Sequence, residues 1–267
     1  MKKIQPIGIF DSGIGGISVM SHIQSLLPDE SLAYVADSLY APYGLKSNDE
    51  ILDRSKAIID YLINNKSSKL IVVACNTATA AAIKDLRQIY DIPIIGMEPA
   101  IKPATKSTKC KRVGILATNG TLESAKFSAL LETYSGEIEF NTQPCPGLVE
   151  LIEQGRINDS LISNLIQEYL DPLIARKVDT IVLGCTHYVF IRNIIENIMG
   201  PEVQIIDTGL AVAKQVKSEL EKFSLRNKLE GKYYSISTNS INREMEEIIG
   251  SITTNANFKF SYFDSWS

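Results

Sequence analysis

Short apolar runs alternate with stretches of helical periodicity along this chain, and polar or glycine-rich turns join them. Four segments follow the order of apolar run, turn and helix, and they start at Pro6, Lys69, Arg112 and Thr180. Repeated units of this kind are typical of parallel sheets with helices packed on their faces. The pattern therefore predicts an α/β fold with mainly parallel sheets.

The four segments form two similar pairs. IGIFDSGIGG, which starts at Ile7, resembles VGILATNGT, which starts at Val113, and IVVACNTA from Ile71 resembles IVLGCTHY from Ile181. The two offsets are nearly equal and far too long for a solenoid repeat. They predict two pseudo-symmetric, doubly wound lobes that face each other, with a binding site in the cleft between them.

The predicted lobes are not contiguous in sequence. We place the first boundary near residues 97–103, and the final sixty residues fit no third repeat, so we expect them to return to the first lobe. The first lobe is then 1–97 plus 208–267, and the second is 98–207. The expected elements after the second pair lie at 203–223, 232–239, 241–250 and 258–263.

Composition narrows the function classes. The 267 residues exceed the usual size of one core, and 45% hydrophobic with 22% charged residues is typical of globular domains. A formal net charge of -4 argues against a nucleic-acid partner. We expect a cytoplasmic protein without membrane contact, since neither a signal peptide nor an apolar run of about eighteen residues is apparent.

Four cysteines are spread thinly through the chain, at Cys75, Cys110, Cys145 and Cys185, which makes a disulfide framework improbable. Cys75 and Cys185 each stand where an apolar strand has just ended, and ligands of open parallel sheets bind beyond this end of the strands. The plain alternative is that each thiol is a small buried hydrophobe. Cys110 and Cys145 receive no functional assignment.

Two thiols that approach a substrate from opposite sides suit inversion at a tetrahedral carbon. A thiolate removes the proton from one face while a thiol delivers another to the opposite face, so no cofactor is needed. A free thiol has a pKa of about 8.5, so a cysteine that acts as a base at neutral pH needs help to lose its proton. Helix N-termini and nearby cations favour the thiolate. The pairs Asn76-Thr77 and Thr186-His187 follow the two cysteines and are able to open helices.

Further polar residues near these motifs are suited to proton handling: Asp11, Ser12, Glu150, Glu153 and His187. Asp11 and Ser12 have a plain alternative as a helix cap, and His22 is interpreted as structural. A zinc site at Cys185 and His187 is disfavoured, because the remaining ligands lack the required spacing. We therefore predict neither a metal nor a cofactor.

The motifs FDSGIGGISV, PYG at 42–44, ACNTATA and GCTHY resemble those of the glutamate racemases, and the likeness extends in order over nearly the whole chain until about Gly209. The resemblance implies cofactor-independent racemisation in which Cys75 serves D-glutamate and Cys185 serves L-glutamate. It also implies a role in peptidoglycan synthesis and a homodimer. Asp11, His187 and Glu153 would assist proton transfer. The implied substrate contacts are Asp11, Ser12, Tyr43, Gly44, Asn76, Thr77, Thr186 and His187.

Some alternatives remain open from the sequence. Glu150 stands where a proline is common in the family, which leaves the choice between Glu150 and Glu153 less certain, although we favour Glu153. A two-cysteine racemase acting on aspartate is the nearest rival. The others are a binding protein that holds an acidic ligand between two lobes, and a hydrolase that uses Cys185 as a nucleophile with His187.

Overall fold

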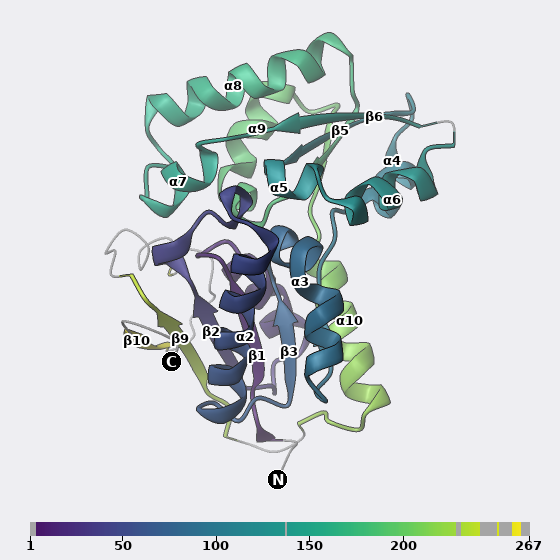
Figure 1. Cartoon of the computed structure of the whole chain (residues 1–267). Helices are drawn as coiled ribbons and strands as arrows, with labels where there is room; N and C mark the ends of the chain where they lie inside the picture. The colour runs from purple at the N-terminus through teal and green to yellow at the C-terminus, as the bar shows by residue number, and fades with distance from the viewer. Residues whose placement is uncertain (1–3, 137, 228–230, 241–249, 251–257, 263–267) are drawn as a thin grey trace.

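Two parallel sheets, each with helices on its faces, form two lobes (Figure 1). The computed structural model describes residues 4–136, 138–227, 231–240, 250 and 258–262. The sheet of the first lobe has the strand order β10-β9-β2-β1-β3-β4, and that of the second lobe has the order β6-β5-β7-β8. All eight strand pairings are parallel. The predicted α/β class with parallel sheets is confirmed.

The strands are β1 (Ile7–Asp11), β2 (Leu32–Ala36), β3 (Leu70–Val73), β4 (Ile94–Ile95), β5 (Arg112–Ala117), β6 (Glu139–Pro144), β7 (Thr180–Leu183), β8 (Gln204–Ile206), β9 (Tyr234–Thr238) and β10 (Phe258–Tyr262). The helices are α1 (Ile17–Leu26), α2 (Asn48–Asn64), α3 (Asn76–Ile89), α4 (Ile101–Ser107), α5 (Asn119–Leu122), α6 (Ala125–Tyr134), α7 (Leu148–Glu153), α8 (Ser160–Ala175), α9 (Arg192–Met199) and α10 (Gly209–Lys222). Short 3₁₀ turns are η2 (Ser38–Tyr40), η3 (Tyr43–Leu45) and η4 (Thr186–Ile191).

The order of strands in the second sheet repeats part of the first. The order β2-β1-β3-β4 in the first sheet corresponds to the order β6-β5-β7-β8 in the second. In each sheet the strand that comes first in the chain lies between the second and the third, and the fourth lies beside the third. β1 and β5 are the central strands that carry the turns of the two similar motifs, while β3 and β7 precede Cys75 and Cys185. The repeated order accounts for the two nearly equal sequence offsets.

The late part of the chain extends the first sheet. β9 pairs with β2, and β10 pairs with β9, while α10 packs along α1. Most of the element expected at 241–250 lies outside the described residues. The proposed limits of the lobes, at 97/98 and 207/208, stay a prediction.

The core explains why the strands are so apolar. β1, β2, β3 and β7 are buried along their whole length, as expected for strands covered by helices on both faces. One cluster of buried apolar side chains continues from the first sheet into the second lobe, where it includes Leu151, Leu183 and Tyr188. The lobes are therefore packed against each other through side chains as well as joined by the chain.

Asp179 fastens the start of β5 to the start of β7. Its carboxylate accepts hydrogen bonds from Thr108 Oγ1 at 2.6 Å, from the Lys109 amide at 2.7 Å and from the Cys110 amide at 2.8 Å. Although partial burial acts to raise the pKa of Asp179, these hydrogen bonds lower it from its ordinary 3.8 to about 2. The ionised form is thus the one that stabilises the loop.

We expect Asp179→Ala to lower the free energy of unfolding at neutral pH by about 2 kcal/mol, the value of hydrogen bonds to a charged acceptor. Because the pKa is lowered in the folded state, this stabilisation is complete above pH 3.8 and is lost as the pH falls through about 2. Urea denaturation at several pH values measures it. Asp85→Ala, at an exposed position of α3, is the control. A difference between wild type and Asp179→Ala that does not shrink below about pH 4 would contradict the assignment.

Candidate active site

The carboxyl ends of the two sheets carry the polar residues that the sequence singled out. In the first lobe β1 leads into Asp11 and Ser12, and β3 leads into Cys75. In the second lobe β7 leads into Cys185, which begins the turn η4. Asp11 Oδ2 accepts a hydrogen bond from Thr186 Oγ1 at 2.9 Å, so the two edges meet directly. The arrow of β3 in Figure 1 points toward the second lobe.

Cys75 caps the N-terminus of α3. Its Sγ accepts a hydrogen bond from the Ala78 amide at 3.4 Å and lies 3.8 Å from Ser12 Oγ. The side chain is only 5% exposed. Burial raises the pKa of the Cys75 thiol well above its ordinary value, and the negative charge of Asp11 adds to this effect, whereas the Ala78 amide opposes it. The free site therefore holds Cys75 as a thiol at neutral pH.

Cys185 has a different neighbourhood. Its Sγ lies 3.8 Å from Nδ1 of His187, whose Nε2 lies 2.6 Å from Glu153 Oε1. Glu153 Oε1 also accepts a hydrogen bond from the Ile14 amide at 2.7 Å. Burial alone would lower the pKa of His187, but its contacts with Cys185 and Glu153 raise it well above 6.5. The imidazolium form places a proton donor against the second thiol.

Asp11 links the two halves of the site. It is fully buried, and its Oδ1 accepts hydrogen bonds from the Ser12 amide at 2.6 Å and from Ser12 Oγ at 3.2 Å. Burial raises the pKa of Asp11, while the charge of His187 and the Thr186 hydroxyl lower it in part. The Asp11 carboxyl group therefore interacts with Cys75 on one side and with Thr186 and His187, which follow Cys185, on the other.

Two glycines of the DSGIGG turn allow this close approach between the lobes. A Cβ on Gly13 would lie 2.0 Å from Glu153 Oε1, and one on Gly15 would lie 2.4 Å from Thr186 Oγ1 and 2.5 Å from His187 Nδ1. No real Cβ tolerates such distances. The glycines are needed for the fit of the second lobe's side chains and do not form a dinucleotide-binding loop.

Three threonine hydroxyls meet between the lobes. Thr77 Oγ1 is 2.9 Å from Thr118 Oγ1 and 3.2 Å from Thr121 Oγ1, and the latter two are 3.0 Å apart. The sequence prediction named only Thr77. Thr118 and Thr121, which the sequence prediction did not name, lie in the ATNGT turn after β5. This turn is the counterpart of the DSGIGG turn after β1, so the internal repeat could have indicated them. Beside them the amide of Asn76 is buried and forms no hydrogen bond within the described part of the chain.

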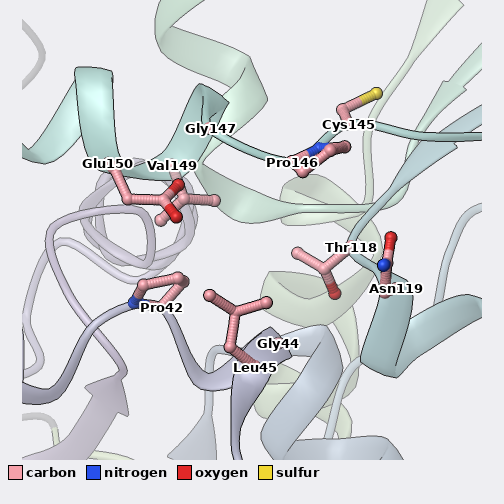
Figure 2. Close-up of a pocket in the computed structure, with 10 residues that line it drawn as sticks. All are labelled: Pro42, Gly44, Leu45, Thr118, Asn119, Cys145, Pro146, Gly147, Val149 and Glu150. Carbon is pink, nitrogen blue, oxygen red and sulfur yellow. The ribbon is translucent and has the colours of Figure 1, made fainter.

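The structure shows the surroundings of Tyr43 and Glu150, which the sequence singled out. The Tyr43 hydroxyl donates to Asp37 Oδ2 at 2.6 Å inside the first lobe, which leaves its backbone rather than its hydroxyl for a substrate. Glu150 lines a small cavity of about 50 Å³, across from Pro42 and Leu45 (Figure 2). Of the two glutamates, Glu153 is the one that contacts His187, so the geometry favours it as the assisting residue.

The pocket of Figure 2 joins the two lobes. Pro42, Gly44 and Leu45 line it from the first lobe, and the second lobe supplies Thr118, Asn119, Cys145, Pro146, Gly147, Val149 and Glu150. Its lining is mostly apolar, with Glu150 as the one carboxylate among these ten residues. The turn that contains Gly44 thus stands at the boundary between the lobes.

Comparison with known proteins gives one consistent picture. Residues 7–216 match the family model described as Asp/Glu/hydantoin racemase. This chain belongs to the Asp/Glu/hydantoin racemase family. The predicted resemblance is thereby confirmed.

Individual members of the family are similar over most of their length. The glutamate racemase of Pseudomonas syringae pv. tomato is 49% identical over 221 residues, 82% of this chain and 80% of the relative. That of Pseudomonas paraeruginosa is 44% identical over 245 residues, 91% and 92% of the two chains.

Solved structures agree with the fold. A glutamate racemase isoform from Bacillus anthracis superposes with a TM-score of 0.85 at 28% identity, covering 98% of this chain and 99% of that one. The Escherichia coli glutamate racemase in complex with L-glutamate and the activator UDP-MurNAc-ala also gives 0.85 at 28% identity, covering 97% and 98%.

Among the described residues no group of three or more His, Cys, Asp and Glu side chains is arranged to hold a metal ion. Within that same portion, no helix has both the length and the apolar character to cross a membrane.

The His187–Glu153 pair can be tested by NMR, because the chain contains only two histidines. We expect the imidazole signals of His187 to titrate well above pH 6.5 and the Glu153→Gln variant to lower that midpoint. Since the folded-state pKa is the raised one, the pair stabilises the protein fully below pH 6.5, and this contribution is lost as the pH rises through the folded pKa. His22→Asn assigns the signals. A His187 midpoint that is unchanged in Glu153→Gln would contradict the pairing.

Proposed function

We propose that this chain interconverts L- and D-glutamate, with Cys75 and Cys185 as the two acid/base residues. The observation that carries the proposal is the pair of buried thiols at the facing edges of two sheets, each with its own proton partner. Cys75 lies beside Ser12 and Asp11, and Cys185 lies beside His187. The charge of Cys185 also acts on Cys75, so the two sulfurs lie close enough to interact.

The reaction needs only one proton in and one proton out. In the direction from L-glutamate, the Cys185 thiolate takes the α-proton and the Cys75 thiol donates its proton to the opposite face, which leaves a thiol at Cys185 and a thiolate at Cys75. The reverse reaction begins from that state. His187 stabilises the thiolate at Cys185 through its charge, and Asp11 is placed to exchange a proton with Cys75.

Protein groups around the thiols are suited to a dicarboxylic amino acid. Donors include the Asn76 amide, the hydroxyls of Thr77, Thr118 and Thr121, and the amides at the start of α3. Helix N-termini favour carboxylates through their free amides. We assign the backbone of Tyr43 and Gly44, together with Ser12 and Thr186, to the same role.

We assign glutamate rather than aspartate as the substrate, because the similar proteins are glutamate racemases. The similar proteins at 44–50% identity are glutamate racemases, and the Escherichia coli structure holds L-glutamate. D-glutamate made in this way is used for peptidoglycan, a general role of this enzyme family. The homodimer and the cytoplasmic location stay predictions, which light scattering and cell fractionation test.

The two thiols can be tested one at a time in heavy water. We expect Cys75→Ser and Cys185→Ser each to lower the racemisation rate by roughly 10²–10⁴-fold, the contribution of a positioned acid/base. If Cys75 serves D-glutamate and Cys185 serves L-glutamate, Cys75→Ser exchanges the α-proton of L-glutamate only, and Cys185→Ser that of D-glutamate only. Proton NMR of the α-position measures both.

The matched control is Cys110→Ser, whose thiol contacts the backbone carbonyls of Arg112 and Lys177, the Thr108 hydroxyl and the Asp179 side chain. These residues lie at the start of β5 and β7, the opposite end of the sheet from the site. It should retain the wild-type rate. Full activity in either Cys75→Ser or Cys185→Ser would refute the two-base mechanism. A covalent substrate adduct in the mass spectrum would instead support the hydrolase alternative.

Substrate choice can be measured by circular dichroism. We expect the signal of L-glutamate to decay to zero, and that of L-aspartate to decay at least about tenfold more slowly at equal concentration, because one methylene in a fitted pocket is worth roughly 10–200-fold. The racemic end point identifies racemisation rather than another loss of substrate. Faster decay with aspartate would overturn the glutamate assignment and leave the two-thiol chemistry intact.

A further inference from the structure

Asp37 is a fully buried carboxylate at the end of β2, the strand beside β1. Its two oxygens accept hydrogen bonds from three side chains that come from distant parts of the chain. Tyr43 Oη donates at 2.6 Å, Arg54 Nε at 2.9 Å and Asn239 Nδ2 at 2.6 Å. A second nitrogen of Arg54 donates to Oδ1 at 2.5 Å, which completes a two-point contact. None of these groups belongs to the proton-transfer machinery described above.

The Tyr43 hydroxyl connects this carboxylate to the substrate site. Its ring is buried in the apolar cluster of the first lobe, and its hydroxyl ends on Asp37. Burial and the charge of Asp37 raise the pKa of Tyr43 well above 10, so the hydroxyl remains a donor. The neighbouring Gly44 faces the second lobe, where a Cβ would lie 2.8 Å from Thr118. The position of Tyr43 therefore sets the position of the Gly44 backbone.

Arg54 holds the other side of the carboxylate. It extends from α2, and its guanidinium stacks on the ring of Tyr40 at 3.6 Å from the ring centroid. Burial acts to lower the pKa of Arg54, but the hydrogen bond and charge of Asp37 raise it. A planar guanidinium bound at two points and stacked on a ring has little freedom. Asp37 is thus held in one orientation.

The end of β9 adds a third restraint. Asn239 donates to Asp37 and accepts a hydrogen bond from the Leu39 amide at 3.0 Å. It therefore ties the segment between Asp37 and Tyr43 to a strand about two hundred residues later in the chain. Together the contacts fix the segment from Asp37 to Tyr43, which includes the first two residues of the turn that runs through Pro42 to Gly44.

We propose that Asp37 is a positioning residue of the racemase site, which holds the Pro42–Gly44 turn through the Tyr43 hydroxyl so that the turn's backbone can bind a carboxylate of glutamate. This inference rests on the proposed function. Asp37 itself touches neither thiol and takes no proton from the substrate. Its effect is on the binding of substrate in the ground state and the transition state alike, so it belongs in KM more than in kcat.

The test is Tyr43→Phe, which removes one hydroxyl and keeps the buried ring. We expect KM for glutamate to rise between about 10- and 100-fold, the cost of a misplaced binding group, with a much smaller change in kcat. Tyr40→Phe is the matched control, since it removes a nearby tyrosine hydroxyl while the ring that stacks on Arg54 stays. It should leave KM unchanged.

A second buried ion pair in the same lobe provides a control that distinguishes a positioning role of Asp37 from a merely structural one. Glu30 precedes β2 and Lys69 precedes β3, so both lie at the end of the sheet opposite to Asp37. Their side chains contact each other at 2.5 Å and are fully buried. Glu30→Gln should lower the melting temperature without changing KM. If Glu30→Gln raises KM as much as Tyr43→Phe does, KM reports general loosening of the lobe and the inference is wrong.

A double-mutant cycle assigns the effect to the Asp37–Tyr43 contact. If Asp37 acts through the Tyr43 hydroxyl, adding Tyr43→Phe to Asp37→Asn should raise KM no further. Additive effects on KM would overturn the inference, and so would an unchanged KM in Tyr43→Phe, which decides alone if Asp37→Asn does not fold. Racemisation of glutamate by the wild type is measured first. Its absence would reject the proposed function, whereas an active wild type with an unaffected Tyr43→Phe rejects only the role of Asp37.

Discussion

Burial of ionisable groups at the facing edges of two parallel sheets is the constraint on which the site depends. Asp11, Cys75 and His187 are almost completely removed from solvent, and an isolated charge in such surroundings is costly. Each group therefore needs polar partners, and one partner of Asp11 lies across the boundary between the lobes. Thr186 bonds to Asp11, and Glu153 bonds to both His187 and the backbone of Ile14. The hydrogen bonds from Thr186 to Asp11 and from the Ile14 amide to Glu153 thus satisfy buried groups and join the two lobes.

Close approach between the lobes follows from this requirement. Glu153 can reach the Ile14 amide only because Gly13 presents no side chain, and Gly15 admits Thr186 and His187 in the same way. The turn after β1 is thus fitted to polar groups of the second lobe. Substitution at either glycine would act on the electrostatics of the thiols through displacement of their partners, even though neither glycine is itself ionisable.

Much of this arrangement could be predicted from the sequence, because short local patterns of apolar and polar residues indicate the strands, turns and helices that form it. The strand, turn and helix units gave the parallel α/β fold, and their repetition located Cys75 and Cys185 on corresponding strands. Long-range contacts were out of reach. The bond between Asp37 and Asn239 joins residues about two hundred positions apart, and nothing local marks Asn239 as a partner. Tyr43 was expected at the substrate from its motif, yet its hydroxyl lies on Asp37, because a buried carboxylate demands donors that only the folded chain can supply.

The unequal surroundings of the two thiols have a chemical consequence. Asp11 adds negative charge near Cys75 and helps to raise the pKa of that thiol, whereas the protonated His187 lies against Cys185. In the proposed two-base mechanism, the form with a thiol at Cys75 and a thiolate at Cys185 is the one that accepts L-glutamate. Because the two enantiomers have equal free energy, kcat/KM must be the same in both directions whatever the asymmetry of the protein. The asymmetry can therefore change kcat and KM for each enantiomer and the division of the enzyme between its two protonation states, but not the equality of kcat/KM. In the proposed mechanism, turnover from D-glutamate requires a thiolate at Cys75, and we assign the acceptance of that proton to Asp11, which is buried with a raised pKa beside the thiol.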